Sequence, residues 1–547
     1  MTTVNKPTLW GMVVVLLLAA ILRLWALPEL PTGLHYDEAA NVILTRQIVE
    51  EGARPLFIRA YTGKEVLFFY LAAPWVWITG GAPWGLRLGA AMMGILTVAA
   101  TFAAVRAMGH RSRLALTAAG WIAVAYPHLL LSRYGFRAIS QPLMQALTLA
   151  LLWRGLRTGR ARWLIGGGVA LGLTGYTYLA ARLFPIPLGL ALVWGWLRQP
   201  SGRHGRMGLR LALALAAALV TFAPLGGFFL NNPEAFTTRI DQVAASTWDA
   251  AARGILRCLA ALGIPGRGDG YVRFNRPGLP VMDGLSVLLS VLGVWALLRK
   301  RAASPLRQGA SVLVLTSSFV MLLPSALATA EITPSNLRMV GLFPMIAVLP
   351  AAGLDLLLRQ AMRQMAMRQL ARRRCNGRPG YGPLPSVVVL VLVLAGGLRS
   401  GAIYNRWSRS TALFHAADGE MVLAARALDA LSTDPDHEEA TFTIASEHYR
   451  HPTVAALAEA YPEAKWITGG GTRVLPAEGS GITMVPVSLT PPAPWPNALT
   501  EAWTVETWLD PAREPALRIY TLGADDVSTL RPAGPGTDFA HVVRVHD

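Results

Sequence analysis

A series of long apolar segments in the first 400 residues limits the folds that this chain can adopt. A helix needs about 20 apolar residues to cross a bilayer, and roughly eleven segments approach that length. Because 53% of the 547 residues are hydrophobic and only 15% are charged, the chain is too apolar for an ordinary soluble protein. We therefore predict an all-α polytopic membrane domain. The segments are residues 8–27, 86–105, 114–131, 138–153, 163–181, 183–197, 210–230, 284–298, 308–330, 339–358 and 384–400.

The positive charge of the chain indicates its orientation. A formal net charge of +18 would suggest a nucleic-acid partner in a soluble protein, but membrane proteins collect Lys and Arg in their cytoplasmic loops. We therefore expect membrane lipids, and no nucleic acid, as partners. The apolar run 67–80 is short and contains Pro74. If it lies on the outer surface as a juxtamembrane helix, successive alternate loops obey the positive-inside rule. These loops are near residues 106–113, 154–162, 198–210, 299–307 and 359–378.

This topology gives two domains in the cytoplasmic (inner) cell membrane. Residues 1–400 form the transmembrane domain, with outer loops 28–85 and 231–283. Residues 401–547 form a small extracytoplasmic domain. A helical stretch at 408–431 and the β-like runs ATFTIAS, SGITMVPVSL and HVVRVH predict that this domain is α/β.

Ionisable residues concentrate at the outer ends of the spans. Charges inside the hydrocarbon are costly, so their positions indicate where a membrane protein meets polar ligands. The pattern predicts a polar site at the outer interface and not a path through the membrane. The residues are Asp37, Glu38, Lys64, Glu65, Arg87, Arg133, Arg137, Arg182, Glu331 and Arg338.

The adjacent acids Asp37 and Glu38 follow the first span. They can supply a general base, a metal ligand or the acidic first turn of a helix. From the residues alone, the helix cap is favoured by roughly two to one. His35 also permits a metal site, which we rank below the cap because three polar residues in one turn are weak evidence.

Lys64 opens the segment that leads into the run 67–80. A compact cation at this depth can hold a phosphate, although an isolated interfacial lysine by default only snorkels. The arginines at positions 133, 137, 182 and 338 have the same two interpretations, phosphate binding or helix ends. Together they would form a cationic ring around the acidic pair. That arrangement suits transfer from a lipid-linked phosphate sugar, with a carboxylate deprotonating the acceptor while cations stabilise the departing phosphate. The lipid tail would lie between helices.

The order of several motifs resembles the GT-C glycosyltransferases that use polyprenyl-phosphate sugars, in particular protein O-mannosyltransferases and the lipid A aminoarabinose transferase. The motifs are LRLWAL, LHYDEAANVI, GKEVLFFYL, LRLGAAMMG, LSRYGFRAISQPLMQAL and GLTGYTYLAARLFPIPL. The likeness runs through about residues 10–200, continues more loosely to TPSNLRMVGLFP, and is only architectural beyond residue 401.

The resemblance implies roles for individual residues. Asp37 is the catalytic carboxylate with Glu38 as its acidic neighbour, and Lys64 binds the lipid phosphate. Where many relatives have Lys-Pro-Pro, this chain has Lys64-Glu65-Val66. This departure leaves the role of Glu65 open, and we count it among the substrate-binding candidates. Position and charge make Arg137, Arg182 and Arg338 candidates for contacts with the donor phosphate or the sugar, and Tyr36 is a candidate for the sugar pocket. Tyr176 and Tyr178 are further candidates for the sugar pocket, or ordinary interfacial tyrosines.

We therefore expect an inverting glycosyltransferase acting on the extracytoplasmic side. The scheme requires no cofactor and leaves a divalent metal open. The alternatives are a transporter or flippase of polyprenyl-linked sugars, or an oligosaccharide ligase or polymerase. A transporter should carry ionisable residues near the bilayer midplane, and these are scarce here. The sugar stays unassigned, as does the acceptor, which is a protein, a lipid or a glycan.

Overall fold

The computed structural model describes residues 6–61, 63–245, 247–299, 304–372, 384–469, 479–489 and 503–526. The chain divides into two compact units. The helical unit comprises Met1–Leu27, Ile48–Ile78 and Gly85–Asn405. The C-terminal unit comprises Arg406–Asp547 together with two earlier segments, Pro28–Gln47 and Thr79–Trp84.

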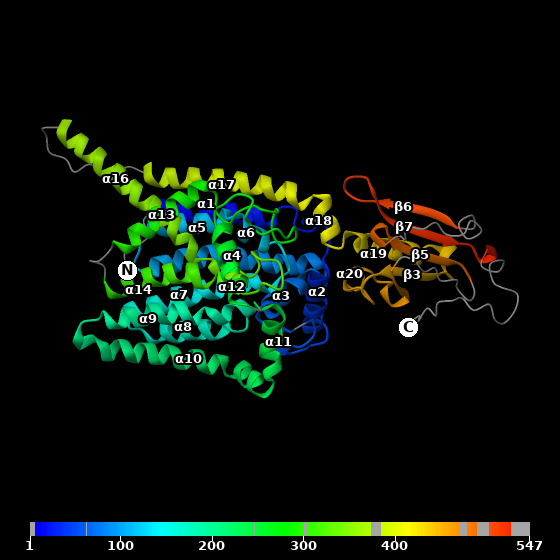
Figure 1. The fold of residues 1–547 in the computed structure, drawn as a ribbon, viewed down its shortest axis with the longest axis horizontal. Coiled ribbons are helices and arrows are strands. Elements are labelled where there is room, and N and C mark those ends of the chain that lie inside the picture. Colours follow the sequence, from blue (N-terminus) through cyan, green and yellow to red (C-terminus); the bar gives the residue numbers. More distant parts are fainter. Residues whose placement is uncertain are drawn as a thin grey trace. The chain divides into compact units, whose positions relative to one another are not determined.

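Helices occupy every apolar segment predicted as a span (Figure 1). The helices in these segments are α1 (Lys6–Leu24), α4 (Pro83–Ala107), α5 (Ser112–Val124), α6 (Tyr126–Leu131), α7 (Ser140–Thr158), α8 (Ala161–Thr174), α9 (Pro185–Leu197), α10 (His204–Asn231), α13 (Gly284–Leu298), α14 (Pro305–Val320), α15 (Leu323–Ala326), α16 (Val348–Arg372) and α17 (Leu384–Ser408). Shorter 3-10 turns join them: η1 (Arg137–Ile139), η2 (Leu179–Leu183), η3 (Ser201–Arg203), η4 (Val340–Leu342) and η5 (Met345–Ala347).

Seven helical stretches in the described part of the chain are long and apolar enough to cross a membrane. Three further apolar helices among the described residues are shorter, and one of them is α3 (Leu67–Ile78). Twelve residues of α-helix measure about 18 Å, well below the roughly 30 Å of a hydrocarbon core. The length of α3 therefore agrees with a helix lying on the surface, and its depth in the bilayer stays a prediction.

The outer loops of the helical unit are themselves structured. The first contains the short strands β1 (Phe57–Ile58) and β2 (Lys64–Glu65), which pair antiparallel. The loop 231–283 contains α11 (Pro233–Val243) and α12 (Trp248–Ala261).

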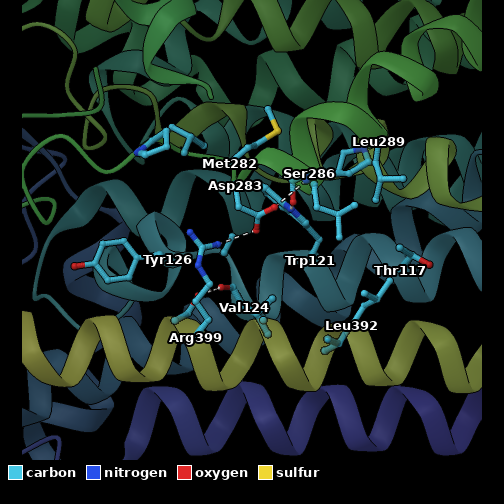
Figure 2. A pocket seen from close by; sticks show the side chains of 18 of the residues that line it. Thr117, Trp121, Val124, Tyr126, Met282, Asp283, Ser286, Leu289, Leu392 and Arg399 are labelled. Atoms are coloured by element: carbon cyan, nitrogen blue, oxygen red, sulfur yellow. Dashed lines mark hydrogen bonds and ion pairs between the residues drawn. The ribbon is translucent and has the colours of Figure 1, made fainter. Parts of the chain in front are cut away.

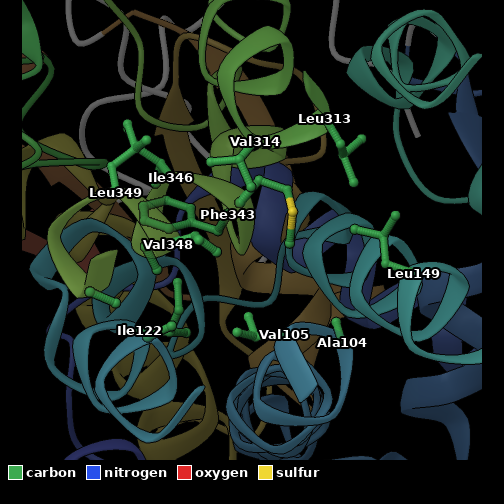
Figure 3. Packing of buried hydrophobic residues seen from close by; sticks show 14 of the residues in the cluster. Ala104, Val105, Ile122, Leu149, Leu313, Val314, Phe343, Ile346, Val348 and Leu349 are labelled. Atoms are coloured by element: carbon green, nitrogen blue, oxygen red, sulfur yellow. The ribbon is translucent and has the colours of Figure 1, made fainter. Parts of the chain in front are cut away.

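The core of the helical unit is a continuous apolar cluster between helices (Figure 3). Figure 3 shows Val105, Ile122 and Leu149 facing Val314 and Phe343 across the cluster. Small residues set how closely the helices approach. A Cβ atom on Gly293 of α13 would collide with the backbone of Leu349 on α16, and one on Gly353 would collide with that of Leu289. Such mutual contacts through glycine are typical of helix pairs in membranes.

The described residues of the C-terminal unit form a five-stranded mixed sheet in the order β4-β3-β5-β7-β6. The strands are β3 (Thr441–Ser446), β4 (Lys465–Thr468), β5 (Gly481–Pro486), β6 (Thr504–Leu509) and β7 (Pro515–Leu522). β3 is parallel to both of its neighbours, and the two remaining pairings are antiparallel. Its helices are α2 (Tyr36–Val49), α18 (Thr411–Ala416), α19 (Gly419–Ser432) and α20 (Pro452–Leu457), with turns η6 (Pro435–His437), η7 (Tyr461–Glu463) and η8 (Val487–Leu489).

Alternating apolar residues explain this sheet. Phe442, Ile444, Ile482 and Met484 of β3 and β5 are buried in one cluster with Leu428 of α19. The predicted membrane fold with a small α/β region near the C-terminus is confirmed. The runs ATFTIAS and SGITMVPVSL supply β3 and β5, whereas HVVRVH lies outside the described residues.

Candidate functional site

The predicted site residues belong to both units. Lys64, Glu65, Arg137, Arg182 and Arg338 lie in the helical unit. Tyr36, Asp37 and Glu38 lie in the C-terminal unit. A single site formed by all of them stays a prediction.

Lys64 and Glu65 form the strand β2 at the entrance to α3. Glu65 pairs with Phe57 and Lys64 with Ile58 of β1. Gly63 allows the chain to enter β2 because its φ of +86° is a conformation that glycine adopts readily. On the other side, the N–H of Leu67 donates to the carbonyl of Tyr176 at 3.0 Å. These backbone contacts hold both residues in buried positions, each 3% exposed as a whole residue.

The Glu65 carboxylate lies between two guanidinium groups. Arg137 donates from Nε to Oε2 at 3.1 Å, and a nitrogen of Arg182 lies 3.4 Å from Oε1. Arg137 also donates to the carbonyl of Gly63 at 3.3 Å. The carboxylate thus orients two arginines that lie far apart in the sequence. Two cations and one anion leave this trio with a formal charge of +1, which suits an anionic ligand.

Each of the two arginine guanidinium groups also lies near an aromatic ring. The Arg137 guanidinium lies 5.3 Å from the centre of the Tyr178 ring, and that of Arg182 lies 4.1 Å from the Phe236 ring. Such cation–π contacts restrict the side chains without neutralising them. Both arginine side chains keep some exposure, 16% and 18%. Arg137, Arg182, Glu65 and the adjacent Lys64 are therefore called the basic group.

The contacts of Arg338 differ from those of the basic group. Its guanidinium pairs with Glu331 and donates to the carbonyl of Ile332 at 3.3 Å. Arg133, which we also placed in the cationic ring, donates to the carbonyls of Leu22 and Trp25 near the end of α1 at 2.9 and 2.7 Å. Arg133 therefore caps a helix, which was the alternative interpretation.

Tyr176 stabilises a bend in α10. Pro224 lies inside that helix and interrupts its hydrogen bonding. The Tyr176 hydroxyl accepts from the N–H of Leu225 at 3.2 Å and donates to the carbonyl of Thr221 at 3.1 Å. These two bonds replace part of the backbone hydrogen bonding that Pro224 interrupts in α10, so Tyr176 has a structural role.

Asp37 and Glu38 occupy the first turn of α2. This is the position that the helix-cap interpretation predicts. The two acids differ in exposure: the Asp37 side chain is 44% exposed, whereas Glu38 is fully buried. The N–H of Asp37 donates to Nδ1 of His35 at 3.0 Å. Asp37 is thus the acid that a ligand can reach.

Residues from the far end of the sequence surround this turn. The Asp418 carboxylate accepts from the N–H of Tyr36 at 2.6 Å. The Tyr36 ring packs edge-on against His448 and His451, with ring centres 5.0 and 5.4 Å away. Sequence reasoning missed all three residues because they lie about 400 positions away and have no motif of their own. Among the described residues, no group of three or more His, Cys, Asp or Glu side chains is arranged to hold a metal.

A cavity of about 130 Å³ lies among α5, α13, α16 and α17 in the helical unit (Figure 2). Its walls are mostly apolar and include Leu289 and Leu392. Figure 2 shows Arg399 reaching Asp283 beside it, at 2.9 Å. The cavity therefore offers apolar space that a hydrocarbon chain could occupy, and the ion pair of Arg399 with Asp283 lies at its wall.

Asp269 is a fully buried acid in the loop 231–283. It accepts from the N–H groups of Tyr271 at 2.8 Å and Asn336 at 2.7 Å. The loop is thereby tied to the segment that carries Arg338. Burial raises the pKa of the Asp269 carboxyl from its ordinary 3.8 to about 7, although the bond from Asn336 and the charge of Arg338 act in the opposite direction.

This pKa predicts a pH dependence of stability. Between about pH 4 and pH 7 the folded chain keeps a proton on Asp269 that the unfolded chain releases. The contribution of Asp269 to the free energy of unfolding is therefore greatest below about pH 4 and falls as the pH rises through 7. Thermal midpoints of wild type and Asp269→Asn in detergent should differ by an amount that changes over this interval. A difference independent of pH from 4 to 8 would contradict the assignment.

Comparisons with known proteins agree with this fold. Residues 53–230 match the family model described as dolichyl-phosphate-mannose-protein mannosyltransferase. The structure of ArnT from Cupriavidus metallidurans bound to undecaprenyl phosphate is similar with a TM-score of 0.54 and 15% identity, over 94% of this chain and 97% of that chain. The apo oligosaccharyltransferase of Archaeoglobus fulgidus is similar with a TM-score of 0.51 and 16% identity, over 82% of this chain and 64% of that chain. No curated protein matches the sequence. The predicted resemblance to GT-C glycosyltransferases is confirmed, and the fold is shared.

Proposed function

We propose that this protein of the GT-C fold transfers a sugar from a polyprenyl-phosphate carrier to an acceptor on the extracytoplasmic side of the membrane. The observation that carries the proposal is the basic group. It presents one buried lysine and two partly buried, pre-oriented arginines at the start of a short apolar helix, within the residues that match the mannosyltransferase family model. A lipid phosphate at headgroup depth has the charge that such a group binds.

Asp37 is the general base of the proposed reaction. Its carboxylate takes the proton from the acceptor hydroxyl or amine as the acceptor oxygen or nitrogen bonds to the anomeric carbon. The bond from that carbon to the phosphate oxygen breaks on the opposite face, so the configuration inverts. Polyprenyl phosphate leaves with the bonding electrons, and Lys64, Arg137 and Arg182 stabilise its growing negative charge. Glu38, which is buried, supports the turn that carries Asp37.

The partial exposure of Asp37 favours its assignment as base. A general base must come within hydrogen-bond reach of the proton that it removes. At 44% exposure the Asp37 carboxylate is accessible to an acceptor. Tyr36 and Arg338 remain candidates for contacts with the sugar.

We place a segment of the carrier's tail in the cavity beside α17. Leu392 lines this cavity and is 36% exposed. Leu392→Trp should therefore raise KM for a long-chain donor by roughly tenfold, as expected for about 1.4 kcal/mol of lost contact, and leave KM for a two-isoprene donor unchanged. Leu398→Trp is the matched control, because Leu398 lies on the same helix but is 78% exposed. An equal increase of KM for the long-chain and the two-isoprene donor would contradict the placement of the tail in this cavity.

A transporter or flippase of the same carriers is the competing class. It would use ionisable residues within the spans. Two buried charges there are instead held by fixed partners: Arg23 donates to the carbonyl of Ala123 at 2.9 Å, and Asp355 pairs with Arg113 at 2.9 Å. These contacts favour a transferase. A ligase or polymerase of oligosaccharides would use similar donors, and the donor panel below distinguishes it.

The proposal is tested with purified protein and a panel of radiolabelled polyprenyl-phosphate monosaccharides and oligosaccharides. Consumption of a monosaccharide donor with release of polyprenyl phosphate is expected, and nuclear magnetic resonance of the product should show the inverted anomer. Use of oligosaccharide donors alone would favour the ligase.

The side of the membrane is tested by labelling a cysteine placed at position 37 with an impermeant reagent in intact cells. If the cysteine is labelled only after the cells are permeabilised, so that the reagent reaches the cytoplasmic face of the membrane, the proposed orientation is wrong.

A further inference from the structure

The first turn of α2 is held by Asp418, a residue from the last segment, Arg406–Asp547, of the same unit. Asp418 lies between α18 and α19 with φ of 53°, a left-handed conformation that aspartate tolerates better than most residues. From this turn its carboxylate accepts the N–H of Tyr36 at 2.6 Å. Tyr36 is the first residue of α2, so its N–H is one of the donors that a helix N-terminus leaves without an internal partner. Asp418 therefore caps a helix located 382 positions earlier in the chain.

His35 supplies the second cap and links it to the same carboxylate. Its Nδ1 accepts the N–H of Asp37 at 3.0 Å. A nitrogen that accepts a hydrogen bond carries no proton, so in the neutral ring the proton is on Nε2. Nε2 faces the Asp418 carboxylate at 4.0 Å, and that negative charge favours this tautomer. Asp418 thus acts on the turn twice, once on the backbone of Tyr36 and once on the ring that binds the backbone of Asp37.

His451 lies beside the same carboxylate oxygen of Asp418. It is 4% exposed, and its Nδ1 accepts the N–H of Thr453 at 3.2 Å. Its Nε2 lies 3.8 Å from the Asp418 carboxylate. Burial, and to a smaller extent the neighbouring His448, lowers the pKa of His451 to about 4. The ring is therefore neutral at physiological pH, with its remaining proton directed towards Asp418.

Further contacts extend along α2. The Thr453 hydroxyl donates to the carbonyl of Leu34 at 2.7 Å, just before the helix. Arg46, near the other end of α2, donates to the carbonyl of Ala456 in α20 at 2.9 Å. α20 therefore contacts the segment at both ends, while Asp418 fixes its first turn.

We propose that Asp418 is a positioning residue for Asp37, so that the segment after residue 405 completes the catalytic turn. This inference rests on the proposed function of Asp37 as general base. Asp418 does not contact the substrate in this account. It sets the backbone from which the Asp37 carboxylate projects. A displacement of a base by about 1 Å can cost about 100-fold in rate.

The test compares Asp418→Ala, Asp418→Asn and Asp429→Ala. Asp429 is the matched control, because it also accepts a backbone N–H within the C-terminal unit, that of Ala460 at 3.0 Å. We expect Asp418→Ala to lower kcat by about 100-fold with KM for the polyprenyl-phosphate donor changed less than about twofold. Asp418→Asn keeps an oxygen that can accept from Tyr36, so it should recover most of the rate. Asp429→Ala should keep the wild-type kcat.

Hydrogen exchange gives a readout that does not depend on activity. Amides of residues 36–39 should exchange faster in Asp418→Ala than in wild type or Asp429→Ala. Unchanged exchange, a wild-type kcat for Asp418→Ala, or an equal loss in Asp429→Ala would overturn the inference. If wild-type protein turns over no donor, the proposed function fails instead, and exchange still reports whether Asp418 holds the turn.

Discussion

Glu65→Gln is expected to destabilise the helical unit by about 3–5 kcal/mol. The Glu65 side chain is 4% exposed and pairs with Arg137 and Arg182 at once. Removing its charge leaves two nearby guanidinium groups without their shared carboxylate, whereas the glutamine keeps the size of the side chain. The loss should appear as a lower thermal midpoint in detergent micelles. Added polyprenyl phosphate should restore part of it by supplying a new anion.

Asp249→Asn is the matched control for that measurement. Asp249 also pairs with an arginine, Arg253, but the two side chains are 71% and 60% exposed. Exposed ion pairs contribute only about 0–1 kcal/mol. A midpoint for Glu65→Gln as high as that for Asp249→Asn would show that Glu65 does not hold the two arginines.

Asp37→Asn should lower kcat by a factor of about 10² to 10⁴, the usual contribution of general acid–base catalysis. The amide cannot take the acceptor's proton. KM for the donor should change little, because the basic group and not Asp37 binds the phosphate. Initial rates over a range of donor concentrations separate these effects. Glu50→Gln is the control, since Glu50 is an exposed acid just after the end of α2. An Asp37→Asn protein that keeps full activity with its acceptor would exclude Asp37 as base.

Periodic and compositional features could be predicted because they arise from local chemistry. Each long apolar segment became helical, since a bilayer requires every backbone group to be satisfied within its own segment. Prolines explain the details that were missed. The predicted span 114–131 is two helices, α5 and α6, with Pro127 in the first turn of the second. The span 339–358 begins as short 3-10 turns around Pro344 before α16 starts.

The candidate site could be predicted only in part. The order of motifs indicated Lys64, whereas position and charge indicated Arg137, Arg182 and Arg338. The structure brings Arg137 and Arg182 onto Glu65, the residue beside Lys64, while Arg338 pairs with Glu331. Glu65 stood out in the sequence as a departure from the pattern of relatives. Its ion pairs with Arg137 and Arg182 explain what a carboxylate does at this position. Asp418 and His451 could not be found this way. Their relation to α2 is a tertiary contact across almost the whole chain, and neither residue has a local motif.

In the proposed reaction the protein breaks the bond between a sugar and a polyprenyl phosphate. The most direct test reconstitutes the purified protein in liposomes that carry a sugar-labelled donor in one leaflet. A cell extract that contains the acceptor is added outside the liposomes. We predict that label leaves the lipid and that free polyprenyl phosphate appears at the same rate, both strongly reduced by Asp37→Asn. If the donor changes leaflet intact and no polyprenyl phosphate is released, the protein is a flippase and this account is wrong.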